Sequence, residues 1–240
     1  MPDSLFESIG WIGLVTLAAV IIGTISRGRR VDWRWLLAAV MTMVVYELLL
    51  TRCWGAVPDP LGDTDWNWTG KLLALGLSLS IASLPVVGWR RVGLTLHQDR
   101  AHLRGPLILS IMLAILFLAL ALWLPGEGVD GETLAFQLTM PGLDEELFYR
   151  GVLLLMFNEA FGRPLRLLGT QMGWGALLTS LAFGLVHALG YDDGAYTFSA
   201  VAMATTGISA LLLVWVREKT GSLLLPILLH NFGNAIFLLV

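Results

Sequence analysis

The chain has 240 residues, of which 56% are hydrophobic and only 14% are charged, with a formal net charge of -3. Soluble domains carry about 25% charged residues, so this chain lacks the charge that solvates an ordinary protein surface. The composition excludes an ordinary soluble domain and predicts an integral membrane protein. Cys53 is the single cysteine, which excludes an intramolecular disulfide and a cysteine metal cluster.

Eight segments are apolar enough to be membrane spans, each needing about 20 mostly apolar residues. In chain order they are Leu5–Ile25, Trp35–Leu50, Thr69–Trp89, Pro106–Leu124, Gly142–Phe161, Trp174–Tyr191, Phe198–Val216 and Leu223–Val240. No basic residue precedes the first segment, so we expect a retained helix rather than a cleaved signal peptide. The prediction is an all-α integral membrane protein: a single bundle of about eight transmembrane helices, forming one transmembrane domain over residues 1–240.

The basic residues fall in alternate connections between these segments. They account for 12 of the 15 lysines and arginines and are Arg27, Arg29, Arg30, Arg34, Arg90, Arg91, Arg100, Arg104, Arg163, Arg166, Arg217 and Lys219. The remaining connections are acidic and contain Asp59, Asp63, Asp65, Glu127, Asp130, Glu132, Asp192 and Asp193. Because basic loops stay in the cytoplasm, we expect a multi-pass protein of the cell membrane with both termini outside the cytoplasm.

The fifth segment contains ionisable residues that are expensive to place in a membrane. Glu146 and Arg150 are four residues apart with the acid first, the favoured order for an ion pair on a helix. Glu145 is rotated by about 100° from Glu146 on an ideal helix, so it need not share that partner. One glutamate can then be neutralised by Arg150 while the other faces the bundle interior. A solvated helix start is the simpler alternative, because helix starts are commonly acidic.

The sixth and eighth segments each add two aligned side chains. Phe183 and His187 share one helix face, and His230 and Asn234 share another. A lone histidine in an apolar helix is usually a packing residue, but two histidines and an asparagine are harder to explain in that way. A buried carboxylate can act as a general base, and two donors can stabilise an oxyanion. These groups are sufficient for amide hydrolysis without a covalent nucleophile.

The three motifs together resemble the CPBP family, the CAAX protease and bacteriocin-processing (Abi) intramembrane glutamic endopeptidases. That family reads Glu-Glu-xxx-Arg, Phe-xxx-His and His-xxx-Asn/Asp, each on a different helix. The matching residues here are Glu145, Glu146, Arg150, Phe183, His187, His230 and Asn234. The family-like catalytic core covers residues 140–238, and the first four segments carry no recognisable motif.

The resemblance implies an eight-helix fold similar to the type II CAAX prenyl endopeptidase and a role for each residue. It implies that Glu145 is the general base, assisted by His187, and that His230 and Asn234 stabilise the oxyanion. Glu146 and Arg150 then support the site from behind, and Phe183 packs against it. The expected activity is metal-independent hydrolysis of a peptide or membrane-protein substrate within the lipid bilayer. No cofactor and no nucleic-acid partner are expected, and the sequence leaves the oligomeric state open.

Three alternatives remain at this point. A zinc protease could use Glu145, His187 and His230 as ligands from three helices, although the His-xxx-His signature on one helix is absent. A non-catalytic immunity or scaffold protein of the same fold is the second alternative, because fold does not fix function. A transporter is the third: Glu7, Glu47 and Lys71 are further ionisable residues in or near spans, but snorkelling or local pairing explains them more simply.

The expected topology places the three motifs at one depth, towards the non-cytoplasmic side. A cavity opening away from the cytoplasm would not meet a prenylated CAAX protein, which lies on the cytoplasmic side. Secreted or membrane-bound peptides, such as bacteriocin or signalling precursors, fit this orientation better.

Overall fold

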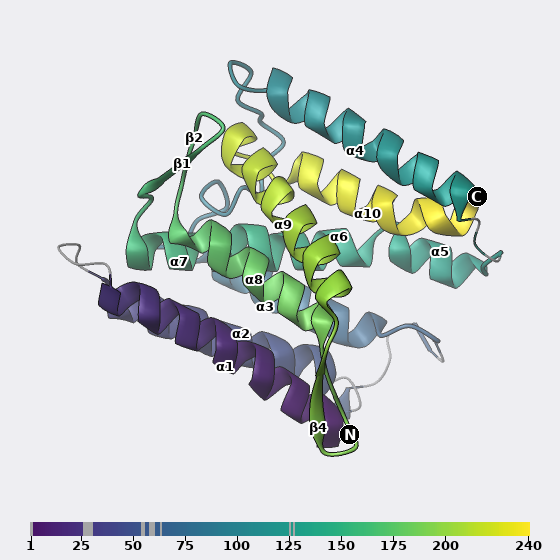
Figure 1. Cartoon of the computed structure of the whole chain (residues 1–240), viewed down its shortest axis with the longest axis horizontal. Coiled ribbons are helices and arrows are strands. Elements are labelled where there is room, and N and C mark those ends of the chain that lie inside the picture. Colours follow the sequence, from purple (N-terminus) through teal and green to yellow (C-terminus); the bar gives the residue numbers. More distant parts are fainter. Residues whose placement is uncertain are drawn as a thin grey trace.

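The computed structural model describes residues 2–25, 31–53, 56–57, 61–62, 64–124, 126 and 128–240. Helices make up most of this part of the chain, as Figure 1 shows. They are α1 (Pro2–Ile25), α2 (Trp33–Thr51), α3 (Trp68–Ser83), α4 (Arg104–Trp123), α5 (Gly131–Gln137), α6 (Met140–Glu145), the π-helix η2 (Glu146–Leu153), α7 (Leu154–Phe161), α8 (Trp174–Ala188), α9 (Ala200–Thr220) and α10 (Leu224–Leu239). The predicted helical fold class is confirmed, and every predicted segment contains a helix.

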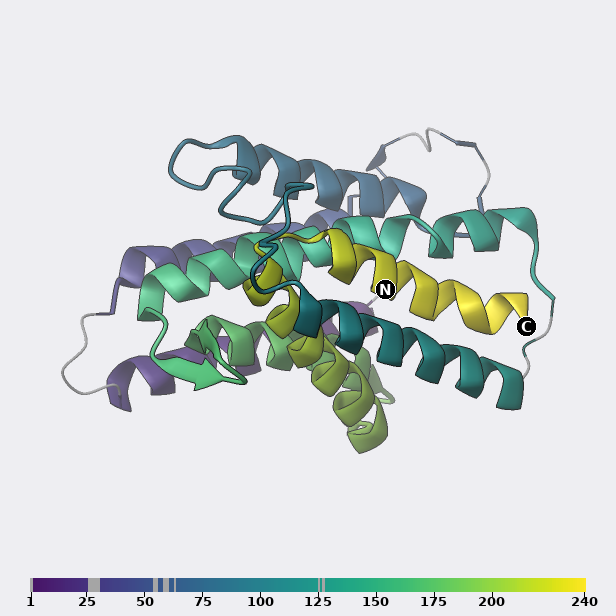
Figure 2. The ribbon, with the colours of Figure 1, turned by 90° about the horizontal axis from the view of Figure 1, so that it is seen from above.

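The centre of the bundle is the unbroken run of α6, η2 and α7. α6 contacts α3 and α10, η2 contacts α3 and α8, and α7 contacts α2 and α8. In Figure 2, α3 lies on one side of this run and α9 crosses on the other. All eight residues of η2 are buried, including Glu146 and Arg150. Glu146 and Arg150 of the fifth predicted segment therefore lie inside the protein.

Four helices, α1, α2, α4 and α9, are long and apolar enough to cross a membrane, and α8 and α10 are apolar but shorter. α4 exposes a row of large apolar side chains, including Ile108, Ile111 and Ile115. An apolar surface of this kind suits contact with lipid. The chain is thus a multi-pass membrane protein, whereas the number of eight spans remains a prediction.

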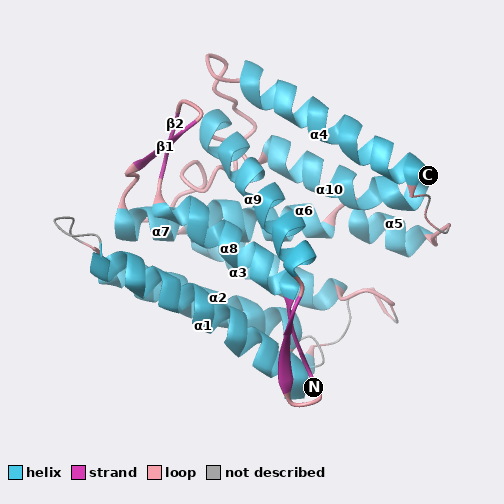
Figure 3. Cartoon of the chain, in the orientation of Figure 1, coloured by secondary structure: helices cyan, strands magenta, loops and turns pink. Residues whose placement is uncertain are grey.

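Two antiparallel hairpins, magenta in Figure 3, interrupt the helices and were not predicted. They are β1 (Leu165–Leu167) with β2 (Thr170–Met172), and β3 (Leu189–Asp192) with β4 (Ala195–Phe198). The second hairpin shows that the predicted sixth span extends too far, because α8 ends at Ala188. Its turn residues Asp193 and Gly194 have φ angles of 49° and 81°. An Asp-Gly pair favours this left-handed two-residue turn.

The third predicted span is also too long, because α3 ends at Ser83 instead of continuing to Trp89. Leu84 has a ψ angle of 135°, in the extended region. Pro85 follows it, and the proline ring disfavours helical geometry at the preceding residue. A proline therefore stops this helix inside the apolar stretch.

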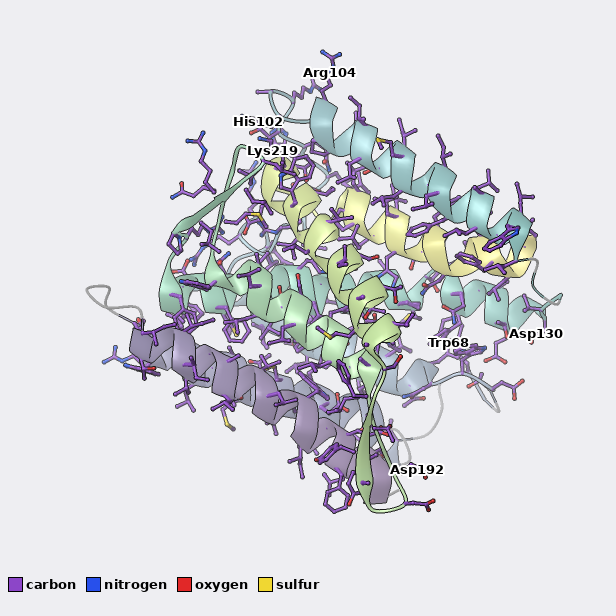
Figure 4. All side chains as sticks on the ribbon, viewed as in Figure 1. Trp68, His102, Arg104, Asp130, Asp192 and Lys219 are labelled. Carbon is purple, nitrogen blue, oxygen red and sulfur yellow. The ribbon has the colours of Figure 1, made fainter. Side chains whose placement is uncertain are left out.

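The two ends of the bundle carry opposite charge. In Figure 4, His102, Arg104 and Lys219 lie together at one end, whereas Asp130 and Asp192 lie towards the other. This is the grouping that the alternating connections predict. Some charged residues used in that prediction lie outside the described residues: Arg27, Arg29, Arg30, Asp59, Asp63 and Glu127. Which end faces the cytoplasm remains a prediction.

Candidate active site

Glu146 is a fully buried acid of the central run. Its side chain is fully buried, and Oε1 lies 3.1 Å from Nη1 of Arg150, one turn along the chain. The same oxygen accepts a hydrogen bond of 2.7 Å from Nδ1 of His230 on α10. The pairing with Arg150 is the one that the i,i+4 spacing predicts. Because an unpaired buried carboxylate is very costly, these two contacts fix both glutamate and histidine.

The π-helix begins at Glu146, immediately after Glu145. A π-helix has i→i+5 hydrogen bonds and is rare, and where it occurs it is frequently found at functional sites. The sequence analysis predicted an ordinary helix here. The change from α to π geometry occurs between the two glutamates, which point to different partners. Glu146 turns towards Arg150 and His230, and Glu145 turns towards α3 and a cavity.

Glu145 has a lysine as its nearest partner. Its Oε1 lies 2.6 Å from Nζ of Lys71 on α3, and its Oε2 lies 3.7 Å from Nε2 of His230. Lys71 also contacts Oδ2 of Asp144 at 3.1 Å, and the hydroxyl of Tyr46 on α2 donates to that oxygen at 2.6 Å. The interpretation of Lys71 as a snorkelling residue was wrong, since it is buried. Pairing, the other explanation offered, is correct, although the partners lie 73 and 74 residues away in sequence.

Sequence reasoning therefore missed Lys71, Asp144 and Tyr46 as neighbours of the site. A lysine within an apolar segment was a usable signal, because ionisable residues inside spans usually mark functional positions. Asp144 directly precedes the Glu145–Glu146 pair in the sequence, but the direction in which its side chain points depends on the helix packing. Tyr46 gave no signal, because a tyrosine in an apolar helix is common.

His187 has a defined ring orientation. Its Nδ1 lies 2.7 Å from the carbonyl oxygen of Phe183. A carbonyl only accepts, so Nδ1 carries the hydrogen, and in the neutral ring Nε2 is left with a lone pair. Phe183 lies between Arg150 and His187: the Arg150 guanidinium is 4.1 Å from its ring centre, and the His187 ring is 4.6 Å away. These contacts support the packing role expected for Phe183.

Asn231, which no motif singled out, joins α10 to the start of α6. Its Oδ1 accepts a 2.7 Å hydrogen bond from the amide of Gly142, and its Nδ2 donates to the carbonyl of Thr139 at 3.3 Å. Gly142 has no side chain, which permits this close approach because a Cβ would meet the Asn231 side chain. The contact sets the position of Glu145 relative to His230.

Two cavities meet at the site. The polar cavity, of about 360 Å³, is lined by Trp66, Asn67, Lys71, Phe136, Gln137, Pro141, Glu145, His187, His230 and Asn234. The apolar cavity, of about 300 Å³, is lined by Leu113, Phe117, Arg150, Phe183, His187, Thr205, Thr206, Ser209, Leu213, Leu229, His230, Gly233, Asn234 and Phe237. Both share His187, His230 and Asn234 as lining residues. An extended peptide that runs from one cavity into the other would therefore pass these three side chains.

Helix α5 covers one end of the polar cavity. Glu132 on α5 accepts hydrogen bonds from the amide of Trp66 at 3.2 Å and from the indole of Trp68 at 3.1 Å. Asp130 caps the helix start by accepting from the amide of Thr133, and this hydrogen bond lowers the pKa of the Asp130 carboxyl. Trp68 and Asp130 lie at the acidic end of the bundle in Figure 4. The polar cavity therefore lies nearer the acidic end than the basic end.

Metal ligation was an alternative for Glu145, His187 and His230. Within the described part of the chain, no group of three or more His, Cys, Asp or Glu side chains has the arrangement of a metal site. Glu145 also binds the Lys71 ammonium through Oε1, where a metal ion would have to compete. The site consists of carboxylate, imidazole and amide groups without a clear metal cage.

The fold and the site together define a helical membrane protein with carboxylate, imidazole and amide groups around a cavity. Residues 132–236 match a family described as Rce1-like, type II CAAX prenyl endopeptidase Rce1-like. The matched part contains all three motifs, from Glu145 to Asn234. It confirms the resemblance to the CPBP family of CAAX proteases, a family of hydrolases. Comparisons with curated proteins and with solved structures found no match.

The Glu146–Arg150 pair predicts a large stability effect. Arg150→Met leaves the buried Glu146 carboxylate without its guanidinium, so we expect a loss of about 3–5 kcal/mol in the free energy of unfolding. Thermal unfolding of the purified protein in detergent measures the loss as a lower melting temperature. The matched control is Arg91→Met, because Arg91 pairs with Glu159 at 2.6 Å on the exposed surface and such pairs contribute about 0–1 kcal/mol. Equal melting temperatures for the two variants would contradict the structural role of Arg150.

Proposed function

We propose that this chain is an intramembrane endopeptidase in which Glu145 activates a water molecule. The observation that carries the proposal is that Glu145, His187, His230 and Asn234 line one cavity, although they come from three separate elements of the bundle. A carboxylate, two imidazoles and an amide are the groups that general-base hydrolysis of an amide requires. The match to a CAAX endopeptidase family over the same residues supports this assignment.

The proposed reaction begins at Oε2 of Glu145, because Oε1 is bound by Lys71. Glu145 takes a proton from water, and the lone pair on Nε2 of His187 accepts a second hydrogen bond that orients the water. The resulting hydroxide attacks the carbonyl carbon of the scissile peptide bond. When the C–N bond breaks, the protonated Glu145 returns its proton to the departing amine. A positioned general base of this kind contributes about 10²–10⁴-fold to the rate.

His230 and Asn234 are proposed to stabilise the oxyanion. Nδ1 of His230 donates to Glu146, so Nε2 is the nitrogen available to the substrate. Nε2 must carry a hydrogen to donate to the oxyanion, so the proposal requires both ring nitrogens of His230 to be protonated. One lost oxyanion donor typically costs about 10²–10³-fold in kcat. Glu146 and Arg150 are proposed to act indirectly, by fixing the orientation of His230 and Phe183.

The opening of the site is proposed to face away from the cytoplasm. Helix α5 follows Asp130, which lies at the acidic end of the bundle, and it borders the polar cavity together with Trp66. Basic loops favour the cytoplasm. This orientation favours secreted or membrane-bound peptides as substrates over prenylated proteins at the cytoplasmic surface.

Reporter fusions test the orientation. A cysteine-accessibility or reporter tag placed at Asp193, in the β3–β4 turn, should be accessible from outside the cell. A tag at Leu168, in the β1–β2 turn at the basic end, should be accessible only from the cytoplasm. The reverse pattern would move the cavity to the cytoplasmic side and restore prenylated CAAX proteins as the favoured substrate class.

Loss of the general base gives the direct test of activity. Cells producing Glu145→Gln should lose a defined set of membrane-derived peptides that cells producing the wild type release, because the amide cannot accept the proton. Turnover should fall about 10²–10⁴-fold. Quantitative peptidomics of the two membrane fractions measures this difference.

The matched control is Glu159→Gln, the same chemical change in α7 at an exposed residue that pairs with Arg91. Its peptide profile should equal that of the wild type. An identical profile for Glu145→Gln and the wild type, with both proteins folded in the membrane, would reject the peptidase and favour the non-catalytic scaffold.

A further inference from the structure

Lys71 is a buried lysine that none of the three motifs explains. It comes from α3, in the N-terminal half of the chain, outside the matched residues 132–236. Its side chain is 11% exposed. Removing an ammonium from water costs several kcal/mol even after relaxation, so a lysine at this position requires compensating contacts.

Those contacts are two carboxylates of the central run. Nζ lies 2.6 Å from Oε1 of Glu145 and 3.1 Å from Oδ2 of Asp144. Tyr46 donates to the same Asp144 oxygen at 2.6 Å, so Asp144 is held from two sides. Asp144 alone could neutralise one ammonium. The shorter contact, however, is made to Glu145, and Lys71 itself lines the polar cavity.

We propose that Lys71 is a positioning residue that fixes the orientation of the Glu145 carboxylate, an inference that rests on the proposed peptidase function. By binding Oε1, the ammonium prevents rotation of the carboxylate and leaves Oε2 on the side of His230. A carboxylate without this anchor could rotate both oxygens away from His230 and lose the geometry for water activation. A shift of about 1 Å in a reacting group can cost about 10²-fold in rate.

The charges around the site explain why a cation is needed there. Asp144, Glu145 and Glu146 lie in consecutive positions, and all three side chains are buried or nearly so. Arg150 pairs with Glu146 alone among them. Without Lys71, Asp144 and Glu145 would face one another across a low-dielectric interior with no cation between them, and adjacent buried anions repel strongly.

The test uses steady-state kinetics of the full-length protein in lipid vesicles. The probe is a quenched-fluorescence peptide copied from a Glu145-dependent cleavage site identified by the peptidomics above. Lys71→Met should lower kcat about 10²-fold and leave KM within about twofold, the pattern of a group that acts in the transition state. Lys71→Arg keeps the charge and should retain kcat within about tenfold of the wild type.

Arg217→Met is the matched control for the loss of a buried cation. Arg217 is buried on α9, where Nη2 donates to the carbonyl of Arg91 at 2.5 Å, and it lines neither the polar nor the apolar cavity. The variant should be destabilised in thermal unfolding, as Lys71→Met should be, but its kcat should stay within about threefold of the wild type. This comparison separates positioning from general destabilisation.

Chemical rescue makes the test independent of folding defects. In a Cys53→Ser background, Lys71→Cys should show the same low kcat as Lys71→Met. Treatment with 2-bromoethylamine forms a new S–C bond with loss of bromide and the thiol proton, and it restores an ammonium at nearly the original length. We expect at least about tenfold recovery of kcat, whereas iodoacetamide, which adds a neutral amide, should give none.

The outcomes distinguish the two proposals. If the wild type and Glu145→Gln release the same peptides, the peptidase function fails and this inference fails with it. If the wild type cleaves the probe but Lys71→Met has wild-type kcat, only the positioning role of Lys71 is rejected. Equal loss of kcat in Lys71→Met and Arg217→Met, or no rescue by 2-bromoethylamine, would also reject it.

Discussion

Charges buried between helices have to be matched by other buried groups, because lipid and apolar side chains cannot solvate them. This constraint organises the centre of the bundle. Glu146 is neutralised by Arg150 and is hydrogen-bonded to His230. Arg150 in turn lies against the ring of Phe183. A requirement for charge pairing thus fixes the positions of these four side chains, of which His230 lines both cavities.

The same constraint separates the two adjacent glutamates. Glu146 is fully enclosed, whereas Glu145 is held by Lys71 through one oxygen and keeps the other towards His230. The π-helix starts at Glu146, between the two glutamates that have these different surroundings. A structural acid and an acid facing a cavity are therefore neighbours in sequence with different environments. Different environments for like groups are a general way in which a protein gives them different chemical tasks.

Much of this arrangement follows from local sequence rules. The spacing of Glu146 and Arg150 predicted their contact, and the apolar segments predicted the helices. The Asp193–Gly194 pair indicates the β3–β4 turn, and Pro85 indicates the end of α3. Both predicted spans were nevertheless drawn too long, because the apolar composition was given more weight than these local signals. Lys71 could not be placed by such rules, because α3 and α6 are about 70 residues apart in sequence and only tertiary packing brings them together. The pairing of Asn231 with Gly142 depends on helix packing in the same way.

The central claim is that Glu145 acts as the base and His230 as an oxyanion donor at the same reacting carbonyl. A peptide phosphinate copied from a cleavage site carries two oxygens in the tetrahedral arrangement of the hydrated peptide bond. An experimental structure of its complex tests the claim most directly. The account predicts one phosphinate oxygen within hydrogen-bond distance of Oε2 of Glu145 and the other at Nε2 of His230 and the amide of Asn234. A phosphinate bound with Glu145 out of contact, or with both oxygens on another group, would contradict it.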